Sequence, residues 1–518
     1  MHQAQRVSRP RLGRMLFQIV LLAIGGVAAA DEPIDMGDRR ELFVDHHLIG
    51  EMKGTRLVLH APRHASVALR FDRPWEGAFC GYVTVIKDGE LYRMYYRGLP
   101  EAGKDGSARE VTCYAESRDG VTWTKPDLGL FEIDGTRENN VVLADAAPAN
   151  HNFSPFLDTS LRASAEERYK ALGGTSESGL VAFVSPDGIR WRTLRDEPVF
   201  RDSGWVFDSQ NVAFWSESEN CYLLYYRKSP AGVRAIARAT SSDFIHWSEG
   251  EMMTFGDTPA EHLYTNQTQP YYRAPHIYVS VAARFMPGRQ VLSSEQAKAV
   301  GVDSAYFGDC SDVVLLTTRG GHRYERTFME SFVRPGPGLE NWVSRTNYAA
   351  LGIVATGDGE MSLYVQKNYG QPTARLDRYT LRPDGFVSVN APYAGRELIT
   401  RPVRFSVNSK AERTSANPRT LSSSTEGARG SARRRTELVL NFATSAAGFI
   451  KVEIQDVQGT PIPGFSLDDA GELIGDEFDR PVTWKGNSDV SRLADQPLRL
   501  RFVMKDADLY AVRFGEAG

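Results

Sequence analysis

The sequence predicts an all-β protein, a five-bladed β-propeller followed by a C-terminal β-sandwich. Three observations support this: a turn motif that recurs along the chain, short runs rich in Val, Tyr, Phe and Trp, and a change of rhythm near residue 400. β-Branched and aromatic residues favour strands, and self-similarity at a nearly fixed period indicates a repeat architecture. The period is long enough for four short strands with their turns, which make one propeller blade.

The recurring turn reads Ser-x-Asp-Gly-x-x-Trp in its clearest copies. Copies and weaker echoes occupy residues 117–123, 185–191, 241–247, 318–324 and 382–386. Their aromatic anchors, spaced 68, 56, 77 and 62 residues apart, are Trp123, Trp191, Trp247, Tyr324 and Phe386. Gly accepts a positive φ, and the Ser and Asp side chains can bond nearby backbone N–H groups. We interpret the motif as a structural turn whose aromatic residue packs between neighbouring units.

Residues 1–30 have the pattern of a secretory signal peptide. Four arginines precede an apolar stretch from Met15 to Ala29, and three alanines stand before Asp31. A retained membrane anchor is the alternative, although the apolar run is short for a span. We expect a secreted or periplasmic protein with no membrane span after the signal is cleaved.

The charge balance argues against a nucleic-acid partner. The chain has 61 Lys and Arg against 65 Asp and Glu, a formal net charge of −4, and removing residues 1–30 takes away four arginines and no acid. No basic face compensates for this excess of acid. The four cysteines have neither zinc-site spacing nor the density of a disulfide scaffold, and the sequence leaves open whether any pair is bridged. Oligomeric state is equally open.

The chain order suggests two domains after the leader. Residues 31–400 are expected to form the propeller and residues 401–518 the sandwich. The segments 41–45 and 57–60 are expected to open the propeller or to close its ring against the last blade. Each blade begins with a polar or aromatic cluster that leads into an apolar strand, and five such starts agree with five turns.

Two segments interrupt this pattern. Residues 288–304 are expected to form an insertion in the fourth blade, near one face of the propeller, with a short capped helix at 293–298. Residues 408–435 are rich in Ser, Thr, Arg, Ala and Gly. They cannot bury a core, which predicts a disordered insertion in the sandwich.

The starts of the five inner strands ring one mouth of the central channel, so their polar residues should converge there. Carboxylates, amides and aromatic rings together suit a sugar, because acids and amides bond hydroxyl groups and rings stack on C–H faces. Cleavage of a glycosidic bond needs two carboxyl groups. The candidates, in order of preference, are Asp208, Glu261, Glu76 and Asp158. The expected substrate-binding residues are His151, Asn152, Gln210, Asn211, Tyr264, Asn266, Gln267, Trp342, Arg345 and Asn347.

The five-unit layout, the Ser-x-Asp-Gly-x-x-Trp turns and the trailing sandwich resemble the five-bladed propeller glycosidases, glycosyl hydrolase families 32 and 43. The resemblance covers the organisation of about residues 40–515. It implies hydrolysis of furanosides, xylosides or arabinosides, with an acid on the inner strand of each of the first three blades. As a member of these families the chain would be divergent, since it lacks their Arg-Asp-Pro and Glu-Cys-Pro triplets.

We therefore expect an exported glycoside hydrolase that acts on poly- or oligosaccharides. The alternative is a non-catalytic carbohydrate-binding or surface scaffold protein, which would keep the amides and rings but lack a working acid pair. No cofactor is expected. The acidic run between Asp468 and Asp479 could hold a structural calcium, but its spacing fits no EF-hand loop and a solvated loop is the simpler interpretation.

Overall fold

The computed structural model describes residues 32–406 and 435–516 of the chain. The predicted signal peptide lies outside the described residues, as does nearly all of the predicted insertion at 408–435. Within the described residues, no helix is long and apolar enough to cross a membrane. All four cysteines lie in the described part, and all are free thiols.

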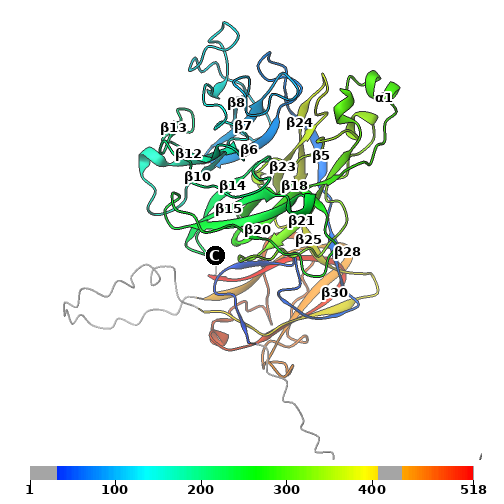
Figure 1. Ribbon diagram of the computed structural model, residues 1–518. Helices are drawn as coiled ribbons and strands as arrows, with labels where there is room; N and C mark the ends of the chain where they lie inside the picture. The colour runs from blue at the N-terminus through cyan, green and yellow to red at the C-terminus, as the bar shows by residue number, and fades with distance from the viewer. Residues whose placement is uncertain (1–31, 407–434, 517–518) are drawn as a thin grey trace, which may run out of the picture. The chain divides into compact units, whose positions relative to one another are not determined.

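Five four-stranded antiparallel sheets form a five-bladed propeller, as the repeats predict (Figure 1). Blade 1 consists of β6 (Gly81–Asp88), β7 (Leu91–Gly98), β8 (Val111–Ser117) and β9 (Val141–Leu143). Blade 2 consists of β10 (Ser154–Leu157), β11 (Tyr169–Thr175), β12 (Gly179–Ser185) and β13 (Arg192–Thr193). Blade 3 consists of β14 (Val212–Ser216), β15 (Cys221–Lys228), β16 (Ala235–Ser241) and β17 (Glu251–Met252). Blade 4 consists of β18 (His262–Thr265), β19 (Thr268–Tyr271), β20 (Ala274–Met286) and β21 (Cys310–Thr318). Blade 5 consists of β22 (Val354–Gly357), β23 (Glu360–Lys367), β24 (Arg375–Leu381) and β5 (Arg63–Arg70).

The ring is closed by β5, which pairs with β24 from Arg63↔Thr380 to Arg70↔Arg375. The expectation that segments 41–45 and 57–60 open the propeller or close its ring is wrong. β4 (Arg56–Leu59) pairs with β25 (Val387–Ala391), and Arg40–Leu42 (β2) pairs with β30 (Arg499–Glu516) in the C-terminal sheet. Closure therefore comes from a strand a few residues further along the chain.

The recurring turns hold the blades as their chemistry predicts. In the first copy, the Asp119 carboxylate accepts hydrogen bonds from the backbone N–H groups of Val121 and Thr122, both at 2.8 Å. These bonds lower the pKa of Asp119 to about 2. Trp123 packs edge-on against Tyr364 of blade 5, with ring centroids 5.7 Å apart. The same bonds recur in the second and third copies, so the motif is a structural turn that packs between blades.

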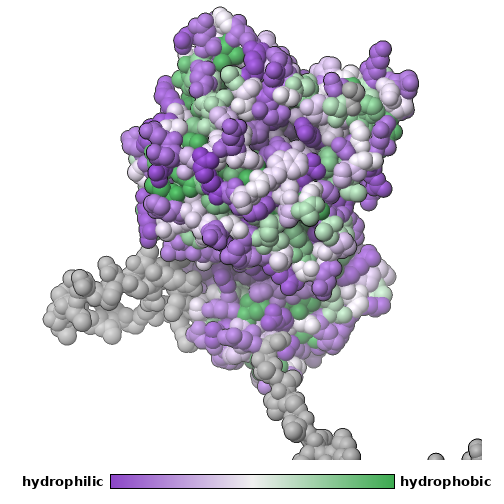
Figure 2. Space-filling view, viewed as in Figure 1, coloured by the Kyte–Doolittle hydropathy of each residue, from purple (hydrophilic) through white to green (hydrophobic). Residues whose placement is uncertain are grey.

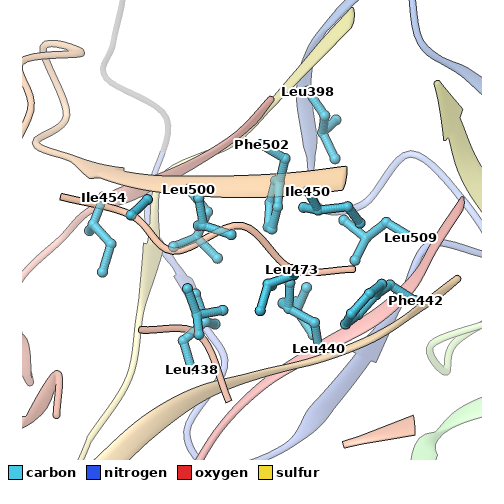
Figure 3. Packing of buried hydrophobic residues seen from close by; sticks show 14 of the residues in the cluster. Leu398, Leu438, Leu440, Phe442, Ile450, Ile454, Leu473, Leu500, Phe502 and Leu509 are labelled. Carbon is cyan, nitrogen blue, oxygen red and sulfur yellow. The ribbon is translucent and has the colours of Figure 1, made fainter. Parts of the chain in front are cut away.

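The C-terminal sandwich is one eight-stranded sheet that encloses a hydrophobic core (Figure 3). Its two long strands, β28 (Thr436–Gln455) and β30, pair along their whole length, with a register shift between Thr444 and Phe449 that marks the bend. Leu440, Phe442 and Ile450 point into this core. The other strands include β3 (Ile49–Lys53), β26 (Arg396–Thr400) and β29 (Asp476–Pro481), and a short parallel pair joins β1 (Ile34–Asp35) to β27 (Val403–Arg404).

The domain boundary at residue 400 stays a prediction, but the pairing shows that strands from both ends of the chain share the sandwich sheet. Regular helices are short. The expected capped helix is confirmed as α1 (Ser294–Ala299), where the Ser293 hydroxyl accepts from the backbone N–H of Gln296 and the Gln296 side chain accepts from that of Ser293. Single 3-10 turns lie at Ala165–Glu167, Pro230–Gly232, Ser304–Tyr306, Leu339–Asn341 and Ser491–Leu493.

Candidate active site

Two glutamine side chains close the central channel below its mouth. Gln267 of blade 4 donates from Nε2 to Oε1 of Gln210 in blade 3, at 2.6 Å, and to the carbonyl of Ala349 in blade 5, at 2.9 Å. Gln210 in turn donates to the hydroxyl of Thr84 in blade 1, at 2.7 Å. Both glutamines are fully buried. They therefore tie the inner strands of blades 1, 3, 4 and 5 together.

Each blade carries a non-glycine residue with a positive φ at or near the start of its inner strand. These residues are Tyr82, Asn152, Phe207, Gln267 and Arg345, with φ between 48° and 63°, and blade 5 also has Asn347, with φ 69°. This left-handed conformation costs free energy for residues other than glycine, and such strain persists where the surroundings fix it, often at functional sites. The backbone at the mouth is thus held in an uncommon conformation in all five blades.

Two arginines stand at equivalent positions on the second strands of blades 1 and 3. Arg97 ends a Tyr-Tyr-Arg run in β7, and Arg227 ends the same run in β15. Arg97 pairs with Asp105 (2.7 Å between Nη1 and Oδ1), and Arg227 pairs with Asp208. Both guanidinium groups are buried, whereas 37% of the Asp105 side chain and 40% of the Asp208 side chain are exposed. Two partly exposed carboxylates are thus anchored from below by buried cations.

A second group of cations surrounds the ring of Tyr264. The guanidinium carbons of Arg227, Arg234 and Arg345 lie 4.5, 5.1 and 5.8 Å from its centroid. Distances of this size allow favourable cation–π interactions. The ring of Tyr264 also contacts that of Tyr348, at 5.2 Å between centroids. Three positive charges are therefore gathered around one buried aromatic side chain.

Trp205 adds an exposed aromatic surface to this group. Its side chain is 52% exposed, and its ring lies 5.5 Å from the guanidinium of Arg227 and 5.7 Å from that of Arg234. Trp205 therefore presents part of its ring to solvent beside two guanidinium groups.

The insertion in blade 4 supplies another wall. Leu292, Ala297 and Tyr306 pack against Phe79 of blade 1 and Tyr369 of blade 5. The guanidinium of Arg345 lies 5.3 Å from the Tyr306 ring. In Figure 2 the outline of the molecule dips between the loops of blade 1 and the segment that carries α1. The prediction that this insertion lies near one face of the propeller is confirmed.

A buried pair formed by His151 of blade 2 and Glu110 lies beneath the mouth. His151 Nδ1 lies 2.9 Å from Oε2 of Glu110, and its Nε2 lies 2.9 Å from the side-chain nitrogen of Asn152. Burial opposes the charge of Glu110, but the bond to His151 and the charge of Arg97 outweigh it and lower the pKa of this carboxyl. Asn152 also donates to the carbonyl of Ser209 in blade 3. This pair is enclosed and links blades 2 and 3.

All four predicted catalytic carboxylates are held in ion pairs, and Asp208, with 40% of its side chain exposed, is the most exposed of them. Glu76 is fully buried and accepts from Tyr96 (2.6 Å) and Lys125 (2.7 Å). Asp158 is held by Lys170 and Tyr222, both at 2.7 Å. Glu261 pairs with Arg284 (3.1 Å) and with Arg326.

Two of the predicted substrate-binding residues lie in the cation group at the mouth, and the other eight are bonded within the propeller. Arg345 and Tyr264 belong to the cation group at the mouth. The amides of Asn211, Asn266 and Asn347 are bonded to backbone carbonyls of their own turns and of neighbouring strands. Gln210 and Gln267 close the channel, His151 belongs to the buried pair beneath the mouth with Asn152 bonded to it, and Trp342 donates to the carbonyl of Gly336 at 3.1 Å.

The sequence reasoning missed Arg97, Asp105, Arg227 and Trp205. The repeated Tyr-Tyr-Arg at the end of two second strands was a usable signal, because a charge that recurs at the same place in two blades must face the same end of the channel. Asp105 and Trp205 lie in loops and carry no periodic signal.

The acidic run near the C-terminus is largely paired. Asp469 pairs with Lys485, Asp476 with Arg382, and Asp479 with Arg40 and Arg273. Among residues 32–406 and 435–516, no three His, Cys, Asp or Glu side chains are grouped as a metal site would require.

Comparison with known proteins gives a likeness of fold only. No protein-family model matches the chain, and no curated protein matches it. Among solved structures, one described as a glycoside hydrolase is 12% identical with a TM-score of 0.43, covering 63% of this chain and 93% of its own. An N-acetylgalactosamine deacetylase from F. plautii, in complex with blood group B trisaccharide, is 13% identical with a TM-score of 0.42, covering 62% of this chain and 95% of its own. A glycosyl hydrolase from Bacteroides ovatus is 13% identical with a TM-score of 0.35, covering 65% and 97%. These matches are too distant to assign an activity.

Proposed function

We propose that the protein is a glycoside hydrolase whose active site is the channel mouth, with Asp105 and Asp208 as its two carboxyl groups. The observation that carries this proposal is their shared setting. They come from different blades, both are partly exposed, and each is fixed by a buried arginine. Arg97, which holds Asp105, lies 4.8 Å from the centroid of the Tyr82 ring, and Arg227, which holds Asp208, lies 4.5 Å from that of Tyr264. These two rings belong to one buried cluster. Both acids therefore face the same group of residues.

Asp105 is suited to act as base or nucleophile. Burial opposes its charge, but Arg97, His151 and Arg345 outweigh that effect and lower the pKa of Asp105. A carboxylate that stays ionised can activate water or attack the anomeric carbon. Asp208 supplies the second carboxyl, and its exposed side chain can approach the oxygen of the leaving group. Trp205 offers a face for stacking on a sugar ring.

The proposal is tested by release of reducing sugar from a panel of plant and algal polysaccharides. We expect release by the wild type and a loss of about 10²–10⁴-fold in Asp105→Asn and Asp208→Asn, the usual contribution of an acid or base. Glu197→Gln is the matched control, since this glutamate is 70% exposed and pairs only with Arg195 among the described residues. Glu261→Gln tests the other favoured candidate. Full activity in both aspartate variants would remove these residues from the mechanism.

The second candidate is a non-catalytic carbohydrate-binding protein. It is favoured by one observation, that Asp208 is engaged by the buried guanidinium of Arg227, so this carboxylate has a structural partner whether or not the protein is an enzyme. Retention of a glycan on an affinity gel without any release of reducing sugar would support this candidate over the enzyme.

We also propose that residues 1–30 direct export and are removed, with the propeller and sandwich as the mature protein. The arginine-led apolar stretch before three alanines supports this. N-terminal sequencing of the protein recovered from its producing cell should begin near Asp31. A chain that still begins at Met1 would favour the retained anchor.

A further inference from the structure

The channel mouth holds more positive charge than its own carboxylates neutralise. Arg97 and Arg227 pair with Asp105 and Asp208. Arg234 and Arg345 are half-buried, and neither has a carboxylate within 4.0 Å among the described residues. A buried polar atom is usually hydrogen-bonded, yet the Nε of Arg234 is buried and has no hydrogen-bond partner in the described structure.

Arg227 also has guanidinium nitrogen atoms that lack a hydrogen-bond partner. Only 2% of its side chain is exposed, and Asp208 engages its Nη2. The Nε and Nη1 atoms are buried and have no hydrogen-bond partner in the described structure. A guanidinium has five N–H donors in a fixed fork that matches carboxylate or sulfate oxygens. The protein covers these donors, so Arg227 contributes its charge to the cluster around the Tyr264 ring, and Arg234 and Arg345 are its less buried members.

We propose that the glycan bound at the mouth is acidic, and that the half-buried Arg234 and Arg345 bind its carboxylate or sulfate group. This inference rests on the proposed carbohydrate site and narrows its substrate class. The uronate of an acidic sugar and a sulfate ester share the chemistry that the site recognises, a planar or tetrahedral oxyanion that accepts several charged N–H bonds. Trp205, beside Arg227 and Arg234, would contact the ring that carries the anion.

The positive charge at the channel mouth is confined to a small part of the protein. The chain as a whole is acidic, with a formal charge of −4. A general attraction to polyanions would require a basic surface, whereas here the cations are concentrated around one aromatic side chain. Binding should therefore depend on an anionic group at a defined position on the sugar and fall as salt screens the half-exposed charges.

The test measures binding of three oligosaccharide classes by isothermal titration calorimetry, using a neutral galactan, an oligogalacturonate and a sulfated galactan. We expect at least tenfold tighter binding of one acidic class than of the neutral one, and the class that binds identifies carboxylate or sulfate as the anion. Arg345→Gln and Arg234→Gln should each weaken that binding about tenfold. Both arginines contact the buried Tyr264 ring, so circular dichroism of each variant must first show that its fold is kept. Arg190→Gln is the control, because Arg190 is 73% exposed on a turn of blade 2, and it should bind within twofold of the wild type.

Each outcome of these measurements supports the acidic substrate or overturns it. Equal binding of neutral and acidic oligosaccharides, unaffected by the arginine variants, would overturn the acidic substrate while the glycoside hydrolase proposal stands. The same holds if reducing sugar is released from the neutral glycan alone. Absence of both binding and hydrolysis across all three classes would count against the inference and the proposed function together.

Discussion

The protein contains two clusters of buried arginines, and they differ in how completely they are neutralised. At the junction of propeller and sandwich, Arg40 and Arg273 share Asp384 and Asp479 as partners. At the channel mouth, Arg234 and Arg345 have no carboxylate partner among the described residues. The desolvation of a buried charge is offset only by a close partner of opposite sign. The junction is therefore complete within the chain, while the mouth would be completed by a ligand.

Asp384 is the centre of the junction. Its side chain is fully buried and accepts from Arg40 (3.0 Å), from Tyr271 (2.8 Å) and from the side chain of Asn441 (2.8 Å). Asp384 belongs to the fifth turn echo, so a residue that in other blades holds a surface turn here joins the propeller to the sandwich. The same turn position has taken a different role because the sandwich covers it.

The largest effect expected from the comparison is loss of the junction acid. Asp384→Ala leaves two buried arginines short of a partner, which should lower the free energy of unfolding by about 3–5 kcal/mol. Chemical denaturation followed by circular dichroism measures this change. Asp187→Ala removes an exposed turn carboxylate and should cost much less. Similar losses in both variants would mean that the junction pairs contribute nothing beyond an ordinary turn.

The junction should also give the protein an acid-sensitive step. Burial opposes the charge of Glu41, but hydrogen bonding to His276 and the charge of Arg319 outweigh it and lower its pKa from 4.5 to about 2. A carboxyl whose pKa is lower in the folded state stabilises it above the unfolded pKa, and this contribution is lost as the pH falls through about 4.5 toward 2. The shift corresponds to roughly 3 kcal/mol.

Glu41→Gln tests this step. The variant should be less stable than the wild type at pH 7, and the difference should shrink as the pH is lowered toward 2. Unfolding free energies measured at several pH values check the sign. A difference that does not change with pH would show that Glu41 contributes through shape and hydrogen bonding, not through its charge.

The repeat made the propeller predictable, whereas the closure and most of the mouth were not. The turn at 117–123 has a local chemistry that fixes its conformation, so it can be recognised without knowledge of distant contacts. The closing strand at 63–70 pairs with residues more than 300 positions away, and no local pattern encodes that choice. Arg345 and Tyr264 were found because they lie at the starts of inner strands. Arg97 and Arg227 end apolar strands, where a charge is usually a solvated terminus.

The smallest expected effect is at the channel mouth, where one substitution separates glycan affinity from the free energy of unfolding. Trp205 is half exposed, and its ring lies beside the guanidinium groups of Arg227 and Arg234. Trp205→Ala should therefore change the free energy of unfolding by no more than about 0.5 kcal/mol. Loss of an aromatic surface for the sugar should weaken glycan affinity about fivefold, in line with the roughly 1 kcal/mol of an aromatic or cation–π contact. Leu161→Ala, at a residue 98% exposed, is the control for both measurements. If Trp205→Ala destabilised the fold as strongly as a junction variant, the ring would be a structural part of the mouth, and the contrast between a completed and an incomplete arginine cluster would lose its meaning.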